Sequence, residues 1–69
     1  MVSLASVGGG VPDLLVSRAG RNVLLEVKDP RQPPNKRKLT PEQQVFHRNW
    51  QGPCVVVETI EQALKAIGL

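Results

Sequence analysis

The 69-residue sequence has a single cysteine, one tryptophan, one phenylalanine and no tyrosine. One cysteine cannot form an internal disulfide, and Cys54 lies in an apolar run, which favours a structural buried thiol. No apolar run is long enough to span a membrane, and no secretory signal pattern is present. We therefore expect one small soluble domain, located in the cytoplasm and not associated with a membrane.

Acidic residues are few and unevenly placed. The net charge is +3, and no Asp or Glu precedes Asp13. Between residues 31 and 38 there are four cations and no acid: Arg31, Lys36, Arg37 and Lys38. A cluster of this kind can bind phosphates without reading sequence, so we expect it to contact DNA, with a solvated loop as the alternative.

Patterns along the chain predict a mixed α/β domain. Weakly apolar residues 2–7 favour a short strand, residues 13–17 and 23–28 favour two longer strands, and the proline-rich residues 29–38 favour a loop. Thr40 and Pro41 begin a helix that ends before Gly52, with Phe46 and Trp50 expected to face the core. The apolar run 54–57 is typical of a strand buried on both faces, and Thr59 begins a last helix.

The strands on either side of Gly20 predict a hairpin whose register decides which side chains meet. A two-residue turn at Gly20-Arg21 would place Asp13 opposite Lys28. Because side chains alternate along a strand, Glu26 would then share a face with both. A three-residue loop would instead move Asp13 to the other face, unless a bulge compensated.

These residues form the pattern P-D-x(12)-E-x-K, which suits metal-dependent hydrolysis of a phosphodiester. Asp13 and Glu26 would supply carboxylate oxygens to Mg²⁺, with the Val27 carbonyl as an additional ligand. Lys28 would orient the attacking water and stabilise negative charge on the phosphoryl oxygens. The alternative is an ordinary ion pair between Glu26 and Lys28. Polar groups that interrupt apolar strands are costly unless they are paired or functional, so the pattern leaves both interpretations open.

Five motifs in order resemble the VRR-NUC family of the PD-(D/E)XK nuclease superfamily. This family comprises small stand-alone phage and bacterial proteins and the C-terminal domain of Fanconi-associated nuclease. The matching stretches are GGVPDLLV (9–16), LLEVKD (24–29), LTPEQ (39–43), FHRNWQGP (46–53) and VVVETIEQAL (55–64). They run through nearly the whole chain, so the resemblance is far more specific than E-x-K alone.

The resemblance implies a restriction-endonuclease-like α/β fold, a small mixed sheet flanked by helices in the order β-β-β-α-β-α. It implies that Asp13 and Glu26 bind Mg²⁺, which Mn²⁺ can replace, and that Lys28 is the catalytic lysine. It adds Gln43 to the active site, although Thr40-x-x-Gln43 is also a capping box. The implied activity is that of a homodimeric DNA endonuclease acting on branched DNA such as four-way junctions.

The chain departs from the family pattern at its beginning. The family normally begins with a helix that carries another acidic residue, whereas the resemblance here starts at the strand before the glycines. We therefore expect a single nuclease-like domain over residues 1–69, truncated at its N-terminus relative to the family. Two alternatives stay open: a catalytically inactive remnant that binds DNA, and a small structural or interaction module.

His47 is expected to be a packing or surface residue, and Glu58 and Glu61 have no partner identifiable from the sequence.

Overall fold

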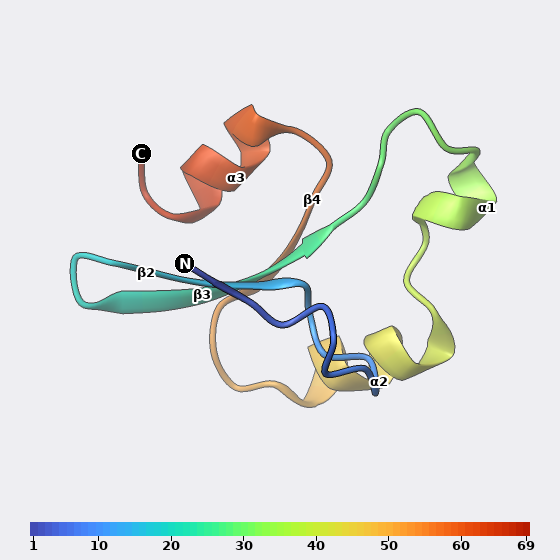
Figure 1. Ribbon diagram of the computed structural model, residues 1–69, viewed down its shortest axis with the longest axis horizontal. Helices are drawn as coiled ribbons and strands as arrows, with labels where there is room; N and C mark the ends of the chain where they lie inside the picture. The colour runs from blue at the N-terminus through green and yellow to red at the C-terminus, as the bar shows by residue number, and fades with distance from the viewer.

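The computed structural model describes all 69 residues and is a small mixed α/β domain with four strands and three helices (Figure 1). The elements in chain order are β1 (Val2–Ser3), β2 (Leu14–Arg18), β3 (Arg21–Val27), α1 (Pro34–Arg37), α2 (Pro41–Asn49), β4 (Cys54–Val57) and α3 (Ile60–Ala66). The strands form one sheet in the order β1-β2-β3-β4, in which the first three are antiparallel and β4 is parallel to β3. The prediction of a mixed α/β domain is therefore confirmed.

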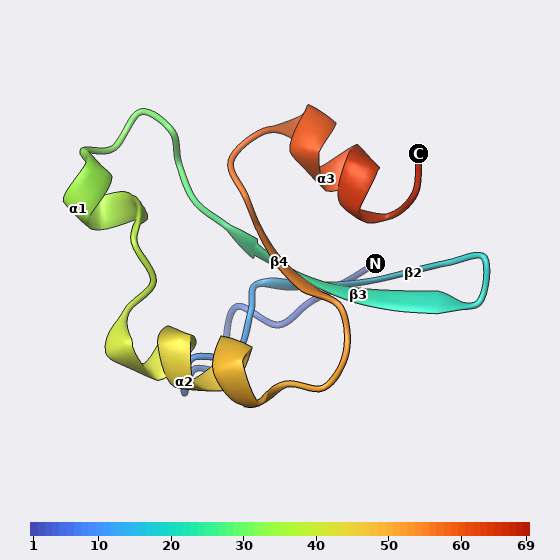
Figure 2. The same ribbon diagram turned by 180° about the vertical axis from the view of Figure 1, so that it is seen from behind.

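One short helix lies where the sequence predicted only a loop. Residues 34–37 form α1, so the element order is β-β-β-α-α-β-α. Pro34 occupies the first turn of this helix, where its missing N–H costs nothing and its fixed φ suits a helix. In both views α1 lies beyond the end of β3, apart from the rest of the domain (Figures 1 and 2).

The hairpin between β2 and β3 turns at Ala19-Gly20, one residue earlier than expected. Both residues have positive φ, 53° and 77°, which is the conformation of a two-residue turn that matches the twist of the strands. Arg18 therefore pairs with Arg21, and the register places Asp13 opposite Glu26 instead of Lys28. The expected register is wrong by two positions, but a shift by an even number keeps every side chain on its predicted face.

Helix α3 covers one face of the sheet and forms the hydrophobic core with it. Val23, Leu25 and Val57 are buried, and Ala63 and Ile67 pack against them. Thr59 caps the helix by accepting a hydrogen bond from the Gln62 N–H at 3.1 Å. Glu26 and Leu24 alternate with the core residues along β3, so they point to the opposite face.

Helix α2 lies on that opposite face (Figures 1 and 2). Thr40 and Gln43 form a complete capping box at its beginning. Phe46 stacks on Trp50 with ring centroids 5.1 Å apart, but Trp50 is 48% exposed. The expectation that both aromatic side chains face the core is therefore wrong for Trp50, which instead lies over Phe46 at the end of the helix.

Strand β4 forms one edge of the sheet. The apolar run 54–57 predicted burial on both faces, yet Val55 and Val56 are 37% and 38% exposed. An edge strand has no neighbour on its outer side, which explains the difference. None of the three helices has the length and apolar character that crossing a membrane would require.

Candidate functional site

Two carboxylates meet where β2 and β3 lie side by side. Asp13 immediately precedes β2, and its Oδ2 accepts a hydrogen bond from the Val27 N–H at 2.8 Å. Glu26 lies opposite Asp13 across the hairpin, on the face covered by α2. The buried Pro12 fixes the chain where it enters β2, so Asp13 is held at the start of the strand.

Glu26 is buried to a degree that is unusual for an acidic residue. Its side chain is only 2% exposed, and its Oε1 has no hydrogen-bond partner. Burial, followed by the neighbouring Asp13 carboxylate, raises the pKa of Glu26 from 4.5 to about 7, with the positive charge of Lys28 acting in the opposite direction. A buried carboxylate oxygen without a partner is costly and points to a ligand or a proton at that position.

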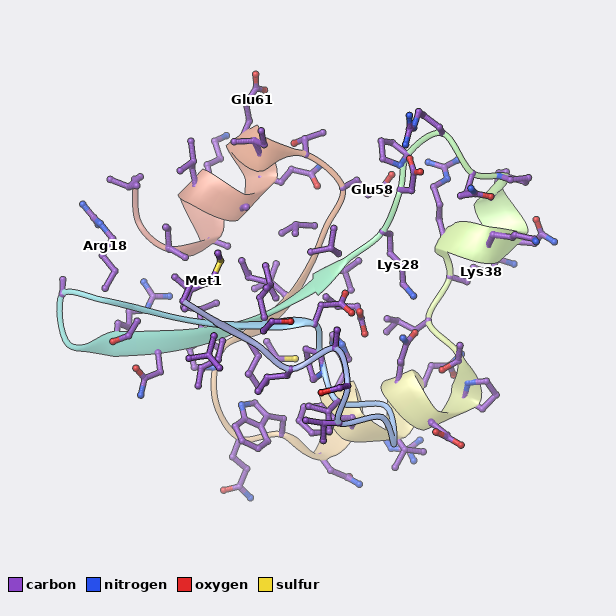
Figure 3. The ribbon with its side chains drawn as sticks, viewed as in Figure 1. Met1, Arg18, Lys28, Lys38, Glu58 and Glu61 are labelled. Atoms are coloured by element: carbon purple, nitrogen blue, oxygen red, sulfur yellow. The ribbon has the colours of Figure 1, made fainter.

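Lys28 extends from the end of β3 toward α2 (Figure 3). Its Nζ donates a hydrogen bond to Gln43 Oε1 at 2.9 Å. The same Oε1 accepts a hydrogen bond from the Thr40 N–H at 2.9 Å, and the Gln43 N–H donates to Thr40 Oγ1 at 3.3 Å. Gln43 therefore caps the helix and binds the lysine at once. The two salt bridges of the structure involve other residues, so Glu26 and Lys28 do not form the ordinary ion pair that the sequence left open.

His47 and Cys54 lie next to this group. Cys54 Sγ is 3.5 Å from His47 Nδ1, and both residues are half-buried. Burial, followed by the Glu26 charge, raises the pKa of the Cys54 thiol. Burial, followed by the Lys28 charge, lowers the pKa of His47. Both shifts favour a neutral thiol and a neutral imidazole, which join the second turn of α2 to β4.

The four cations between residues 31 and 38 do not form one patch. Arg31 is bound to Asp29, with Nε 3.1 Å from Oδ1. Arg37 is bound to Glu58, with Nη1 3.1 Å from Oε2, so Glu58 has a partner that the sequence did not reveal. Lys36 and Lys38 form no salt bridge and are exposed, and Lys38 points away from the domain (Figure 3). Only these two lysines remain free for an anionic partner.

Asp13 and Glu26 could offer carboxylate oxygens to a magnesium ion, which would take its remaining ligands from the backbone, water and substrate. No group of three or more His, Cys, Asp or Glu side chains is arranged to hold a metal, so Asp13 and Glu26 would need further ligands. The Val27 N–H points to Asp13, and the C=O of a strand residue points to the same side as its N–H. Two carboxylates and one carbonyl would then offer hard oxygen donors of the kind that Mg²⁺ prefers, and water would supply the other ligands.

Gly10 is a site residue that sequence reasoning missed. A Cβ at this position would lie 2.4 Å from Glu42 O and 2.9 Å from Gln43 N, so the loop that contains Gly8, Gly9 and Gly10, the glycine loop, packs directly against the first turn of α2. The sequence contains three consecutive glycines, at positions 8 to 10, but it does not show which segment they approach. The partner lies more than thirty positions along the chain, and no local pattern identifies it.

The structure thus brings together Asp13, Glu26, Lys28 and Gln43, and it keeps the cations of residues 31–38 largely apart from one another. A pair of carboxylates with a lysine held beside it can bind a cation and stabilise charge on a phosphate. Comparison of the chain with protein-family models, with curated proteins and with solved structures gives no match in any of the three.

Proposed function

We propose that this chain is a metal-dependent DNA endonuclease of the VRR-NUC type. The observation that carries the proposal is the buried Glu26 carboxylate, whose Oε1 has no partner, directly opposite Asp13. Lys28 lies two residues further along β3 and is held by Gln43. A structural role alone gives no reason to bury an acid beside a second acid and leave one of its oxygens without a hydrogen bond.

Each residue has a distinct role in the proposed reaction. Asp13 and Glu26 would hold Mg²⁺ or Mn²⁺, with the Val27 carbonyl as a third oxygen. When bound, the ion neutralises the phosphate and lowers the pKa of the attacking water. Lys28 orients that water and stabilises negative charge on the phosphoryl oxygens. Gln43 keeps the lysine ammonium in place, because its Oε1 is itself fixed by the Thr40 N–H.

The proposed substrate is branched DNA, and the proposed active form is a homodimer. Both come from the resemblance of the sequence to the family. Two sites related by a two-fold axis would cut two strands. Lys36 and Lys38 form no salt bridge, and they are proposed to bind phosphates. Arg31 and Arg37 already neutralise Asp29 and Glu58, so we propose a smaller role for them in DNA binding.

A DNA-binding protein without nuclease activity is the second candidate. It is favoured by the presence of only two carboxylates at the site. It is also favoured by the Glu26 pKa of about 7, because a protonated glutamic acid binds a cation poorly at neutral pH.

A cleavage assay separates the two candidates. Labelled four-way junctions and linear duplexes are incubated with the folded protein and increasing Mg²⁺ or Mn²⁺. The nuclease is expected to cleave only with metal, and Lys28→Ala is expected to lower the rate at least about 100-fold while DNA affinity changes little. Lys65→Ala, which alters an exposed lysine of α3 outside the site, is the matched control. If the folded chain cleaves no DNA form with either metal but binds DNA in a salt-dependent way, the second candidate is correct.

A further inference from the structure

We infer that Gly10 is a positioning residue that sets the distance between the glycine loop and α2, and through it the contact between Gln43 and Lys28. The relevant contact joins two backbones. A Cβ on Gly10 would lie 2.4 Å from the Glu42 carbonyl oxygen and 2.6 Å from its carbon. These neighbours are main-chain atoms of a helix, so they cannot rotate away as the end of a flexible side chain would.

The size of the displacement follows from van der Waals contact. Non-bonded carbon and oxygen atoms normally stay about 3.4 Å apart, so a methyl group at position 10 requires loop and helix to separate by about 1 Å. Lys28 Nζ and Gln43 Oε1 are 2.9 Å apart. A shift of the helix by about 1 Å along the line between these two atoms would take the distance beyond the range of a hydrogen bond.

The loop and the helix carry different parts of the site, which makes this spacing important. Gly10 is followed after two residues by Asp13, whose carboxylate faces Glu26. The first turn of α2 carries Gln43, which holds the lysine. The contact at Gly10 therefore links the carboxylate side of the site to the amide that positions Lys28. The catalytic part of this inference rests on the proposed nuclease function.

Gly8 and Gly9 provide matched controls in the same loop. All three glycines have positive φ, at 76°, 65° and 82° for Gly8, Gly9 and Gly10. An alanine at any of them is strained by a similar amount. A Cβ on Gly8 or Gly9, however, meets no atom within 4 Å. Gly9→Ala thus introduces the backbone strain without the collision, and the difference from Gly10→Ala isolates the contact with α2.

The test measures cleavage by Gly10→Ala, Gly9→Ala, Gln43→Ala and the double variant Gly10→Ala/Gln43→Ala. Rates are corrected for the folded fraction, and sodium sulfate keeps weakened variants folded. Gly10→Ala is expected to lower kcat on the order of 100-fold with KM nearly unchanged, and Gly9→Ala less than about threefold. In the Gln43→Ala background, Gly10→Ala is expected to add little, because the two changes remove the same interaction. Equal rates for Gly10→Ala and Gly9→Ala, or additive losses in the double variant, would overturn the inference.

A second measurement does not depend on nuclease activity. In the NMR spectrum of the wild-type chain, we expect a nuclear Overhauser contact between the Gly10 Hα protons and the Gln43 amide proton. We also expect one between the Lys28 and Gln43 side chains, retained in Gly9→Ala and lost in Gly10→Ala. Absence of the first contact overturns the inference. If the wild-type chain cleaves no DNA while both contacts are present, the proposed function fails and the positioning role of Gly10 stands.

Discussion

Replacing Glu26 by glutamine is expected to stabilise the metal-free fold at neutral pH while abolishing cleavage. Glu26 is 2% exposed, lies beside Asp13 and has an oxygen without a partner. Its pKa is raised from 4.5 to about 7, so the folded chain keeps a proton that the unfolded chain has already released. Glutamine has nearly the same shape, stays neutral at every pH and cannot replace the carboxylate as a metal ligand.

The size of the effect follows from linkage. Between pH 4.5 and about 7 the folded state binds more protons than the unfolded state, so the free energy of unfolding falls as pH rises through this window. At about 1.36 kcal/mol per pKa unit, the total loss is about 3 kcal/mol. The core of so small a domain supplies roughly 3–5 kcal/mol of stability. The metal-free wild-type chain is therefore expected to be close to unfolding at pH 8.

Urea unfolding followed by circular dichroism at pH 5 and pH 8 tests this reasoning. Wild-type and Glu26→Gln chains should have similar stability near pH 5, and the variant should be more stable by about 3 kcal/mol at pH 8. Mg²⁺ at 100 times its dissociation constant should then restore about 2.7 kcal/mol to the wild-type chain at pH 8 and nothing to the variant. If both chains lose stability in parallel with pH, or Mg²⁺ stabilises both equally, Glu26 is neither the buried acid nor the metal ligand described above.

Three further changes test other parts of the structure. Ala19→Gly should raise the free energy of unfolding by roughly 0.5–1 kcal/mol, because Ala19 has a φ of 53° in the hairpin turn. Thermal unfolding would show the gain, and an unchanged or lower melting temperature would contradict the left-handed conformation of Ala19. Lys36→Ala should weaken binding to every DNA sequence alike and reduce the slope of log affinity against log salt concentration by about 1. Arg37→Ala removes the partner of Glu58 and should therefore affect the stability of the fold more than this slope. Equal slopes for the two variants would contradict the assignment of free and paired cations. Leu25→Ala should cost about 2–5 kcal/mol and unfold most of the chain, as circular dichroism would show, because Leu25 belongs to the buried core.

The carboxylate pair could be predicted from the sequence even though the hairpin turn was not. Alternation places Asp13 and Glu26 on one face for any register that differs by an even number of residues. The turn moved by one residue and the pairing by two, because Ala19 adopts the left-handed conformation that glycine usually supplies. The alternation of side chains along the strand therefore predicted the shared face correctly, whereas the identity of the turn residues did not predict the position of the turn.

The features that the sequence did not predict depend on contacts between distant segments. Arg37 lies in a run of cations that resembles a solvated loop, and only the folded chain brings it to Glu58. An apolar run does not reveal whether its strand is central or at an edge, so the exposure of Val55 could not be derived. The glycine at position 10 is visible in the sequence, but its close approach to α2 depends on where a helix about thirty residues later is placed.

The open outer edge of β4 has a consequence for how the protein behaves in concentrated solution. Residues 54–57 carry no charge and no proline, and an edge with this composition can pair with the backbone of another chain. Such pairing would extend the sheet sideways, in its own plane. Both faces of the sheet, including the α2 face with Glu26 and Lys28, would then remain as they are in the single chain. Concentration-dependent association through β4 is therefore compatible with an open site, whereas association over α2 would cover it.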